Sequence, residues 1–183
     1  MISITSKQVE QAFVSAFYNE YKTLLKGGFD EPFYRAATDQ RPEAVIEYRS
    51  DYVASALHEV AHWCVAGPER RKVDDFGYWY TPDGRDEDIQ RQFEVVEVRP
   101  QAYECLFTWS LKRPFRVSAD NLALHDYDDR DFQARVIAEV GSILASEMPP
   151  RVARFCQHLW GLVSSPEHKL TNWLEQQYEN FSR

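Results

Sequence analysis

The chain has few cysteines and no apolar run as long as a membrane span. Its three cysteines, Cys64, Cys105 and Cys156, are odd in number and far apart, which excludes a disulfide framework and a Cys-x-x-Cys metal site. The N-terminus lacks the charged and then apolar segment of a signal peptide. We therefore expect reduced cysteines, no membrane partner and a protein that stays in the cytoplasm.

Positive charge is also scarce. The chain has 21 Lys and Arg residues against 29 Asp and Glu residues, a net charge of −8, which argues against nucleic acid or an anionic membrane as the main partner. The basic run Arg70-Arg71-Lys72 is the local exception. A length of 183 residues with 44% apolar residues suits one domain that spans residues 1–183.

The most informative motif is an HExxH sequence at residues 58–62. It lies within a segment, Tyr52–Ala66, whose residues predict one apolar helix. Residues four apart on a helix share a face, with Cβ atoms about 5–6 Å apart, so His58 and His62 can bind one ion. Glu59 is rotated away from both histidines, which leaves its carboxylate available for proton transfer. The motif therefore predicts a divalent metal site.

This helix is also expected to lie in the interior. Apolar residues recur at i, i+3, i+4 and i+7, at Leu57, Val60, Ala61 and Cys64. Two imidazoles and a carboxylate are costly to bury unless hydrogen bonds or an ion satisfy them. A metal satisfies all of them in one step.

A metal site of this kind needs a third protein ligand. We predict a second helix over Glu87–Val98, with Asp86 as its N-cap and Pro100 as its end. Glu94 and Glu97 are three residues apart on it and share a face. We assign Glu97 as the ligand and expect Glu94 to bind a ligand histidine or a backbone group. The alternatives are that Glu94 is the ligand, or that both glutamates are solvated.

The remaining segments predict a helix-rich α+β fold with a small sheet, built around a zincin-like HExxH helix. A first helix over Lys7–Lys26 should end at Gly27-Gly28, and residues 30–42 read as a loop. Strands are expected at Ala44–Tyr48 and Phe76–Tyr80, with Phe115–Val117 extended. After Pro100 the chain is predicted to continue as helix over Gln101–Lys112. Three further helices are predicted, at Asp131–Met148, Pro150–Val163 and Pro166–Phe181.

Two enzyme classes use this ligand set. In a metallopeptidase, His58, His62 and Glu97 hold zinc and a water, and Glu59 takes a proton as the water attacks a carbonyl. Two histidines and one carboxylate are also the facial triad of non-haem iron oxygenases. The order of the motif, HExxH followed by a later Glu, favours hydrolysis. A non-catalytic binding module that a metal stabilises is the third hypothesis.

Several longer segments resemble the bacterial elongation factor P hydroxylase family. The likeness spans most of the chain and is weaker in the first fifty and last twenty residues. The segments are ALHEVAHWCVAG (Ala56–Gly67), RRKVDDFGYWYTPDGRD (Arg70–Asp86), QFEVVEVRPQA (Gln92–Ala102) and, less distinctively, ADNL (Ala119–Leu122) and RVARF (Arg151–Phe155).

The resemblance implies an iron-type oxygenase, a protein hydroxylase that acts on the β-lysylated lysine of elongation factor P. Its scaffold would differ from the jelly-roll hydroxylases. Carried onto this chain, the metal ligands are His58, His62 and Glu97, which bind a divalent metal, expected to be Fe(II), with zinc as the alternative in isolated protein. The resemblance leaves open whether Glu59 acts as a base or orients ligands and water.

A macromolecular substrate must present one lysine side chain at the metal. Acidic groups suit its amines and aromatic walls suit its methylenes, so we expect the segment Phe76–Arg85 beside the metal opening. Within it we assign Tyr78, Trp79 and Asp83 to substrate binding. We expect the basic run at residues 70–72 to meet an acidic surface of elongation factor P.

Overall fold

The structure is a computed structural model, which describes residues 4–75, 87–118, 128–164 and 168–182. Within these ranges it is rich in helix and has one small sheet, as predicted. The elements are α1 (Ser6–Tyr21), β1 (Thr23–Phe29), β2 (Phe33–Arg35), β3 (Ala44–Arg49), α2 (Val53–Val65), the short 3₁₀ helix η1 (Arg70–Lys72), α3 (Glu87–Ser110), α4 (Arg130–Ala145), α5 (Pro150–Trp160) and α6 (Leu170–Phe181).

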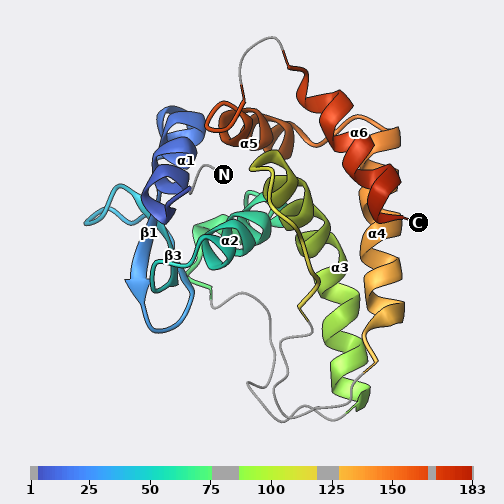
Figure 1. The fold of residues 1–183 in the computed structure, drawn as a ribbon. Coiled ribbons are helices and arrows are strands. Elements are labelled where there is room, and N and C mark those ends of the chain that lie inside the picture. Colours follow the sequence, from blue (N-terminus) through green and yellow to red (C-terminus); the bar gives the residue numbers. More distant parts are fainter. Residues whose placement is uncertain (1–3, 76–86, 119–127, 165–167, 183) are drawn as a thin grey trace.

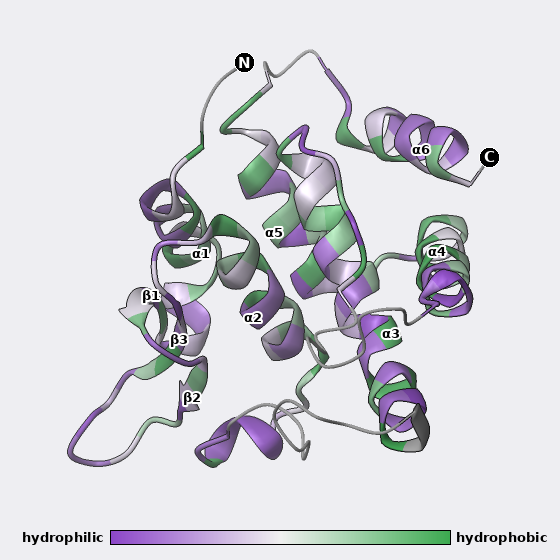
Figure 2. Ribbon diagram, turned by 60° about the horizontal axis from the view of Figure 1, so that its bottom comes forward, coloured by the Kyte–Doolittle hydropathy of each residue, from purple (hydrophilic) through white to green (hydrophobic). Residues whose placement is uncertain are grey.

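Helix α2, which carries the HExxH motif, lies at the centre of the molecule. It packs between the sheet and α3, and α1 and α5 also contact it (Figure 1 and Figure 2). Helices α4 and α6 pack on α3, on the side away from the sheet (Figure 1). The expected helix over Tyr52–Ala66 is therefore confirmed almost to the residue, and Leu57, Val60 and Ala61 are completely buried or nearly so.

The first helix ends earlier than predicted. Lys22 adopts a left-handed conformation with φ 48°, and its N–H donates to the Tyr18 carbonyl at 2.9 Å. The chain then enters β1, so the prediction of helix as far as Lys26 is wrong. The cause is tertiary: β1 pairs in parallel with β3, and this pairing buries Leu25 in the core.

The sheet has the strand order β1-β3-β2. Strand β2 pairs antiparallel with β3. It lies within residues 30–42, which were predicted as a loop, and its three residues are the part of that segment that forms a strand. Strand β3 confirms the predicted strand at Ala44–Tyr48 and leads into α2 through residues 50–52. The Tyr48 hydroxyl donates to Glu10 Oε1 at 2.8 Å, which ties the sheet to α1. The sheet and α1 together fix where α2 begins.

Helix α3 does not end at Pro100, so the predicted break is wrong, whereas the predicted helix over Gln101–Lys112 is confirmed as its second half. It continues to Ser110 with Pro100 in its interior. An interior proline removes one backbone hydrogen bond and costs about 3 kcal/mol. Packing on both sides of the proline offsets this cost, because Phe93 before it and Leu106 after it are buried. Val96, whose carbonyl loses its donor, is 40% exposed, so water can replace that donor.

The three C-terminal helices are confirmed with small shifts at their ends. Two predictions lie outside the described residues, the strand at Phe76–Tyr80 and the N-cap at Asp86. No helix in the described part of the chain is both long and apolar enough to cross a membrane.

A glycine in α4 allows α6 to pack closely, and this gives a first prediction. A Cβ at Gly141 would lie 2.6 Å from Cζ of Tyr178, which is closer than van der Waals contact allows. Replacing glycine by alanine normally stabilises a helix by about 1 kcal/mol. Because of the clash, Gly141→Ala should instead lower the free energy of unfolding by about 1–3 kcal/mol. Urea unfolding measures the change.

The control is Gly161→Ala. A Cβ there meets nothing closer than 3.5 Å, so the substitution should be close to neutral. Adding Tyr178→Ala to Gly141→Ala should remove the clash. Equal effects of Gly141→Ala with and without Tyr178 would contradict the close packing.

Candidate metal centre

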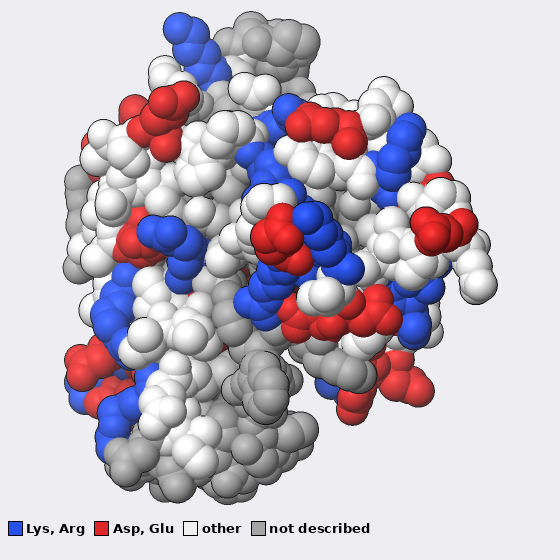
Figure 3. Space-filling model, turned by 180° about the vertical axis from the view of Figure 1, so that it is seen from behind, with Lys and Arg blue, Asp and Glu red and all other residues white. Residues whose placement is uncertain are grey.

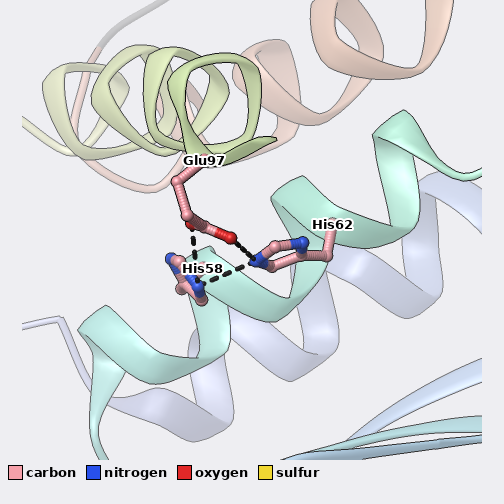
Figure 4. Close-up of side chains that lie close together, drawn as sticks. All are labelled: His58, His62 and Glu97. Carbon is pink, nitrogen blue, oxygen red and sulfur yellow. Dashed lines mark hydrogen bonds and ion pairs between the residues drawn. The ribbon is translucent and has the colours of Figure 1, made fainter. Parts of the chain in front are cut away.

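Three side chains from two helices converge at one point. His58 and His62 lie one turn apart on α2, and Glu97 reaches them from α3 (Figure 4). One ligand atom of each lies within 4.8 Å of the others. Glu97 is buried, with 2% of its side chain exposed, and the two histidines are partly buried. The predicted set of three is thus brought together.

The spacing of these atoms fits one divalent ion. The two Nε2 atoms are 2.9 Å apart, and the Glu97 oxygens lie 3.4 Å from His62 Nε2 and 3.8 Å from His58 Nε2. Ligands at about 2.0–2.2 Å from a metal, at angles between octahedral and tetrahedral, lie roughly 3.0–3.5 Å from one another. Small side-chain adjustments therefore suffice for all three to bind the same ion.

A second carboxylate holds His58 in this orientation. The Nδ1–H of His58 donates to Glu104 Oε2 at 2.9 Å, and Glu104 is also on α3, two turns after Glu97. A ligand histidine usually donates its other ring N–H to a carboxylate or carbonyl, which fixes the tautomer and raises the basicity of the ligand nitrogen. Glu104 leaves Nε2 of His58 directed at Glu97 and His62.

The electrostatics of the site favour a positive charge. Burial works to lower the pKa of His58, but the hydrogen bond to Glu104 and the charges of Glu104, Glu59 and Glu97 raise it overall. Burial, the charge on His58 and the charge on Arg70 hold the pKa of His62 well below 6.5. His58 is therefore the charged ring, and the proton on its Nε2 lies in the hydrogen bond to His62 Nε2. A cation bound between them would replace this proton.

Glu94 has a different role from the one predicted. Its Oε2 accepts a hydrogen bond from Arg135 on α4 at 2.5 Å, and it is buried, with 2% of its side chain exposed. The expectation that Glu94 binds a ligand histidine or a backbone group is therefore wrong. Glu104 has the histidine contact instead. The choice of Glu97 over Glu94 as the residue beside the histidines agrees with the structure.

A buried polar stripe on α3 is the sequence signal that points to Glu104. Its members recur at i, i+4, i+7, i+11 and i+14, and the first four are at most 2% exposed. They are Gln90, Glu94, Glu97, Gln101 and Glu104. Polar residues at a helical spacing that elsewhere carries apolar residues indicate partners on the facing helices. The pattern is visible only if the helix is continuous across Pro100, because a break there leaves the residues before and after it without a common register.

A pocket opens beside His62. It is lined by two residues of the HExxH motif, Glu59 and His62, by three aromatic side chains and by Ile46, Ala66, Arg70, Arg71 and Asp75. The aromatic walls are Phe33, Tyr34 and Trp63. Such a lining, apolar with a few charged groups, is typical of a pocket for a small molecule or a side chain. Glu59 therefore faces the same space as a candidate metal ligand.

Comparison with known proteins identifies the family. The model of the elongation factor P hydroxylase family matches residues 12–173. An elongation factor P lysine hydroxylase from Haemophilus influenzae is 45% identical over 155 residues, which make up 85% of this chain and 87% of the relative. The chain belongs to the elongation factor P hydroxylase family. The resemblance of the sequence segments is thereby confirmed.

Membership of the elongation factor P hydroxylase family does not test the predicted substrate contacts. Tyr78, Trp79 and Asp83 lie outside the described residues. Asp75, the last described residue before them, lines the pocket and pairs through its backbone with Tyr34 at 2.8 and 3.0 Å. The assignment of these three residues to substrate binding stays a prediction.

The basic run at residues 70–72 is less exposed than expected. Arg70 Nε donates to Asp75 Oδ2 at 2.5 Å, and Arg71 donates to the Ala66 carbonyl. Only Lys72 is exposed at the surface, where it pairs with Glu69. A contact of this run with an acidic partner stays a prediction, and Arg71 has a structural role in addition.

The ligand set gives the second prediction. His58→Ala, His62→Ala and Glu97→Gln should each abolish stoichiometric binding of a divalent metal while the far-UV circular dichroism remains native, because the site is small beside the core. Metal content by mass spectrometry and equilibrium dialysis measure the loss.

Glu94→Gln is the matched control for Glu97→Gln. It should lower stability by about 1–3 kcal/mol, because Arg135 loses a charged partner, and still bind metal. Metal loss in Glu94→Gln alone would reverse the assignment of the two glutamates.

The third prediction concerns Glu104. Glu104→Leu should weaken metal affinity by about 10–100-fold without abolishing it, because His58 keeps its ligand nitrogen but loses the group that orients it. A competitive titration with a coloured chelator measures the affinity. Glu139→Leu, which removes a carboxylate paired with Arg99, should leave the affinity unchanged. Equal affinities of the two variants would remove Glu104 from the site.

Proposed function

We propose that the protein is a metal-dependent hydroxylase that adds one oxygen atom to the β-lysylated lysine of elongation factor P, with iron as the metal. Family membership supports hydroxylation of elongation factor P. The observation that carries the metal requirement is the convergence of His58, His62 and Glu97 within 4.8 Å. Two histidines and one carboxylate are the ligand set of non-haem iron oxygenases.

Different residues of the chain would bind the metal, orient its ligands and handle protons in such a reaction. Bound iron would supply the redox chemistry by which dioxygen, with two electrons from a reductant and two protons, converts a C–H bond into C–OH and releases the second oxygen as water. His58, His62 and Glu97 would hold the metal, and Glu104 fixes the ring of His58. Glu59 lines the pocket, and there it can orient water or accept a proton.

The pocket matches the chemistry of a lysine side chain. Phe33, Tyr34 and Trp63 offer aromatic surface for methylene groups, and Glu59 brings negative charge for an ammonium group. Asp75 also lines the pocket, but Arg70 already balances its charge. Tyr34 is fixed in place, because its hydroxyl donates to the Arg71 carbonyl at 3.0 Å. Because this side chain is already ordered, little conformational entropy is lost when substrate binds against it.

One face of the molecule, as far as the described residues form it, has no patch of charge of a single sign. Seen from behind, acidic and basic side chains are interspersed rather than gathered into a patch of one sign (Figure 3). We place the reaction in the cytoplasm, with elongation factor P as the protein partner.

A metallopeptidase is the second candidate, because the HExxH motif puts Glu59 in the same pocket as His62. In a peptidase Glu59 is the general base, and Glu59→Gln would lower turnover by about 10²–10⁴-fold with metal retained. In a hydroxylase this substitution need not have so steep an effect. Glu59→Gln therefore separates the two reactions.

The fourth prediction tests the reaction itself. The protein, loaded with Fe(II) and given a reductant in air, should add the mass of one oxygen to β-lysylated elongation factor P and leave the backbone intact. Intact-mass and fragment spectra locate the added oxygen on the modified side chain. Glu97→Gln should abolish the addition, because it removes a ligand.

Elongation factor P with an unmodified lysine is the substrate control and should gain less oxygen or none. Cleavage of peptide bonds by the wild-type protein, lost in Glu59→Gln, would establish the peptidase and overturn the hydroxylase.

A further inference from the structure

The last turn of α2 ends in an unusual way. Helices often end with a glycine in the left-handed conformation, which satisfies the final carbonyl groups. Here the C-cap is Ala66 with φ −59° and ψ 126°, and the next residue, Gly67, does not have a positive φ. The carbonyls at this end need other donors. His62, a candidate metal ligand, lies in this same turn.

Two arginines supply those donors. Arg151, at the start of α5, donates to the carbonyls of Trp63 at 3.0 Å, Cys64 at 3.1 Å and Ala66 at 2.9 Å. Arg71, next to the pocket, also donates to the Ala66 carbonyl. The planar guanidinium fork is suited to such multiple contacts, and a cation at a helix C-terminus is favoured by the helix dipole.

The same two guanidinium groups pack against aromatic rings. The Arg151 Cζ lies 4.9 Å from the centre of the Trp63 ring, and the Arg71 Cζ lies 5.5 Å from it. Both groups also lie near the ring of Tyr21, at 6.0 and 5.5 Å. Burial, followed by the charge of Arg151, lowers the pKa of Arg71, so the two cations are close enough to repel each other.

We propose that Arg151 and Arg71 are positioning residues that clamp the last turn of α2 and so hold His62 in the geometry for metal binding. The proposal rests on the proposed function, because it gives His62 the role of a ligand. Arg151 contacts the carbonyl of Trp63, the residue that follows His62, so the clamp fixes the rotation of this turn about the helix axis. Arg71 connects the same turn to the pocket wall, since its carbonyl accepts from Tyr34.

The chain provides a matched control on the same helix. Arg154 lies three residues after Arg151 on α5 and also combines hydrogen bonds with an aromatic contact. Its partners are the Ala16 carbonyl at 3.4 Å, Glu20 at 2.7 Å and the ring of Phe17 at 5.7 Å. All of them belong to α1. Arg154→Met thus removes a comparable arginine without touching the metal helix.

The test measures Co²⁺ affinity rather than turnover. Co²⁺ is titrated into metal-free wild type, Arg151→Met and Arg154→Met at a temperature where circular dichroism shows each to be folded. We expect Arg151→Met to lower the affinity by about tenfold and to alter the visible Co²⁺ spectrum, and Arg154→Met to stay within about twofold of wild type. A folded Arg151→Met with wild-type affinity would overturn the clamp.

Arg151→Lys keeps the test decisive if Arg151→Met does not fold. The ammonium group of lysine keeps the charge but cannot reproduce the planar fork or the stacking on Trp63, so a lower Co²⁺ affinity is expected here too. Wild-type affinity in this variant would also overturn the clamp. If the affinities change as expected but wild type transfers no oxygen to elongation factor P, the clamp stands and the proposed function fails.

Discussion

The packing of α2 against α3 depends on one constraint, the burial of ionisable groups between them. Glu97 is almost inaccessible to water, and His58 and His62 are partly buried opposite it. Buried charges are stable only when other charges or hydrogen bonds compensate them closely. The two helices must therefore meet with His58 between Glu97 and Glu104, and neither helix can slide along the other without losing these contacts.

This constraint also explains the length and continuity of α3. The polar stripe runs from Gln90 to Glu104, which at 1.5 Å per residue covers about 21 Å of helix. Its members serve different neighbours: Glu94 pairs with Arg135 on α4, and Gln101 exchanges hydrogen bonds with the backbone of Ser118 at 2.7 and 3.0 Å. A break at Pro100 would place the two halves of the stripe on different faces, so tertiary contacts hold the helix together across the proline.

The sequence predicts the parts of the site that depend on local spacing. His58 and His62 follow from a spacing of four on an apolar helix, and Glu97 follows from its place on the next helix. Glu104 lies in the segment predicted as helix after Pro100, but its position relative to Glu97 could not be assigned, because Pro100 normally ends a helix and its tolerance depends on packing. Likewise, residues 23–26 have helical apolar spacing, and only the pairing with β3, a contact distant in sequence, makes them a strand.

Charge balance links the ligand set to its surroundings. A divalent ion held by His58, His62 and Glu97 would bring two positive charges into a partly buried site. Glu97 supplies one of the two negative charges that compensate them. The second comes from Glu104, which acts through His58 and makes that imidazole a stronger donor. The metal and these two carboxylates together are neutral, which lowers the cost of burying the ion. Glu59 then adds negative charge on the pocket side, where a cationic lysine side chain would approach. The HExxH motif thus indicates where a metal would bind, whereas the carboxylates around it would balance the charge of the ion.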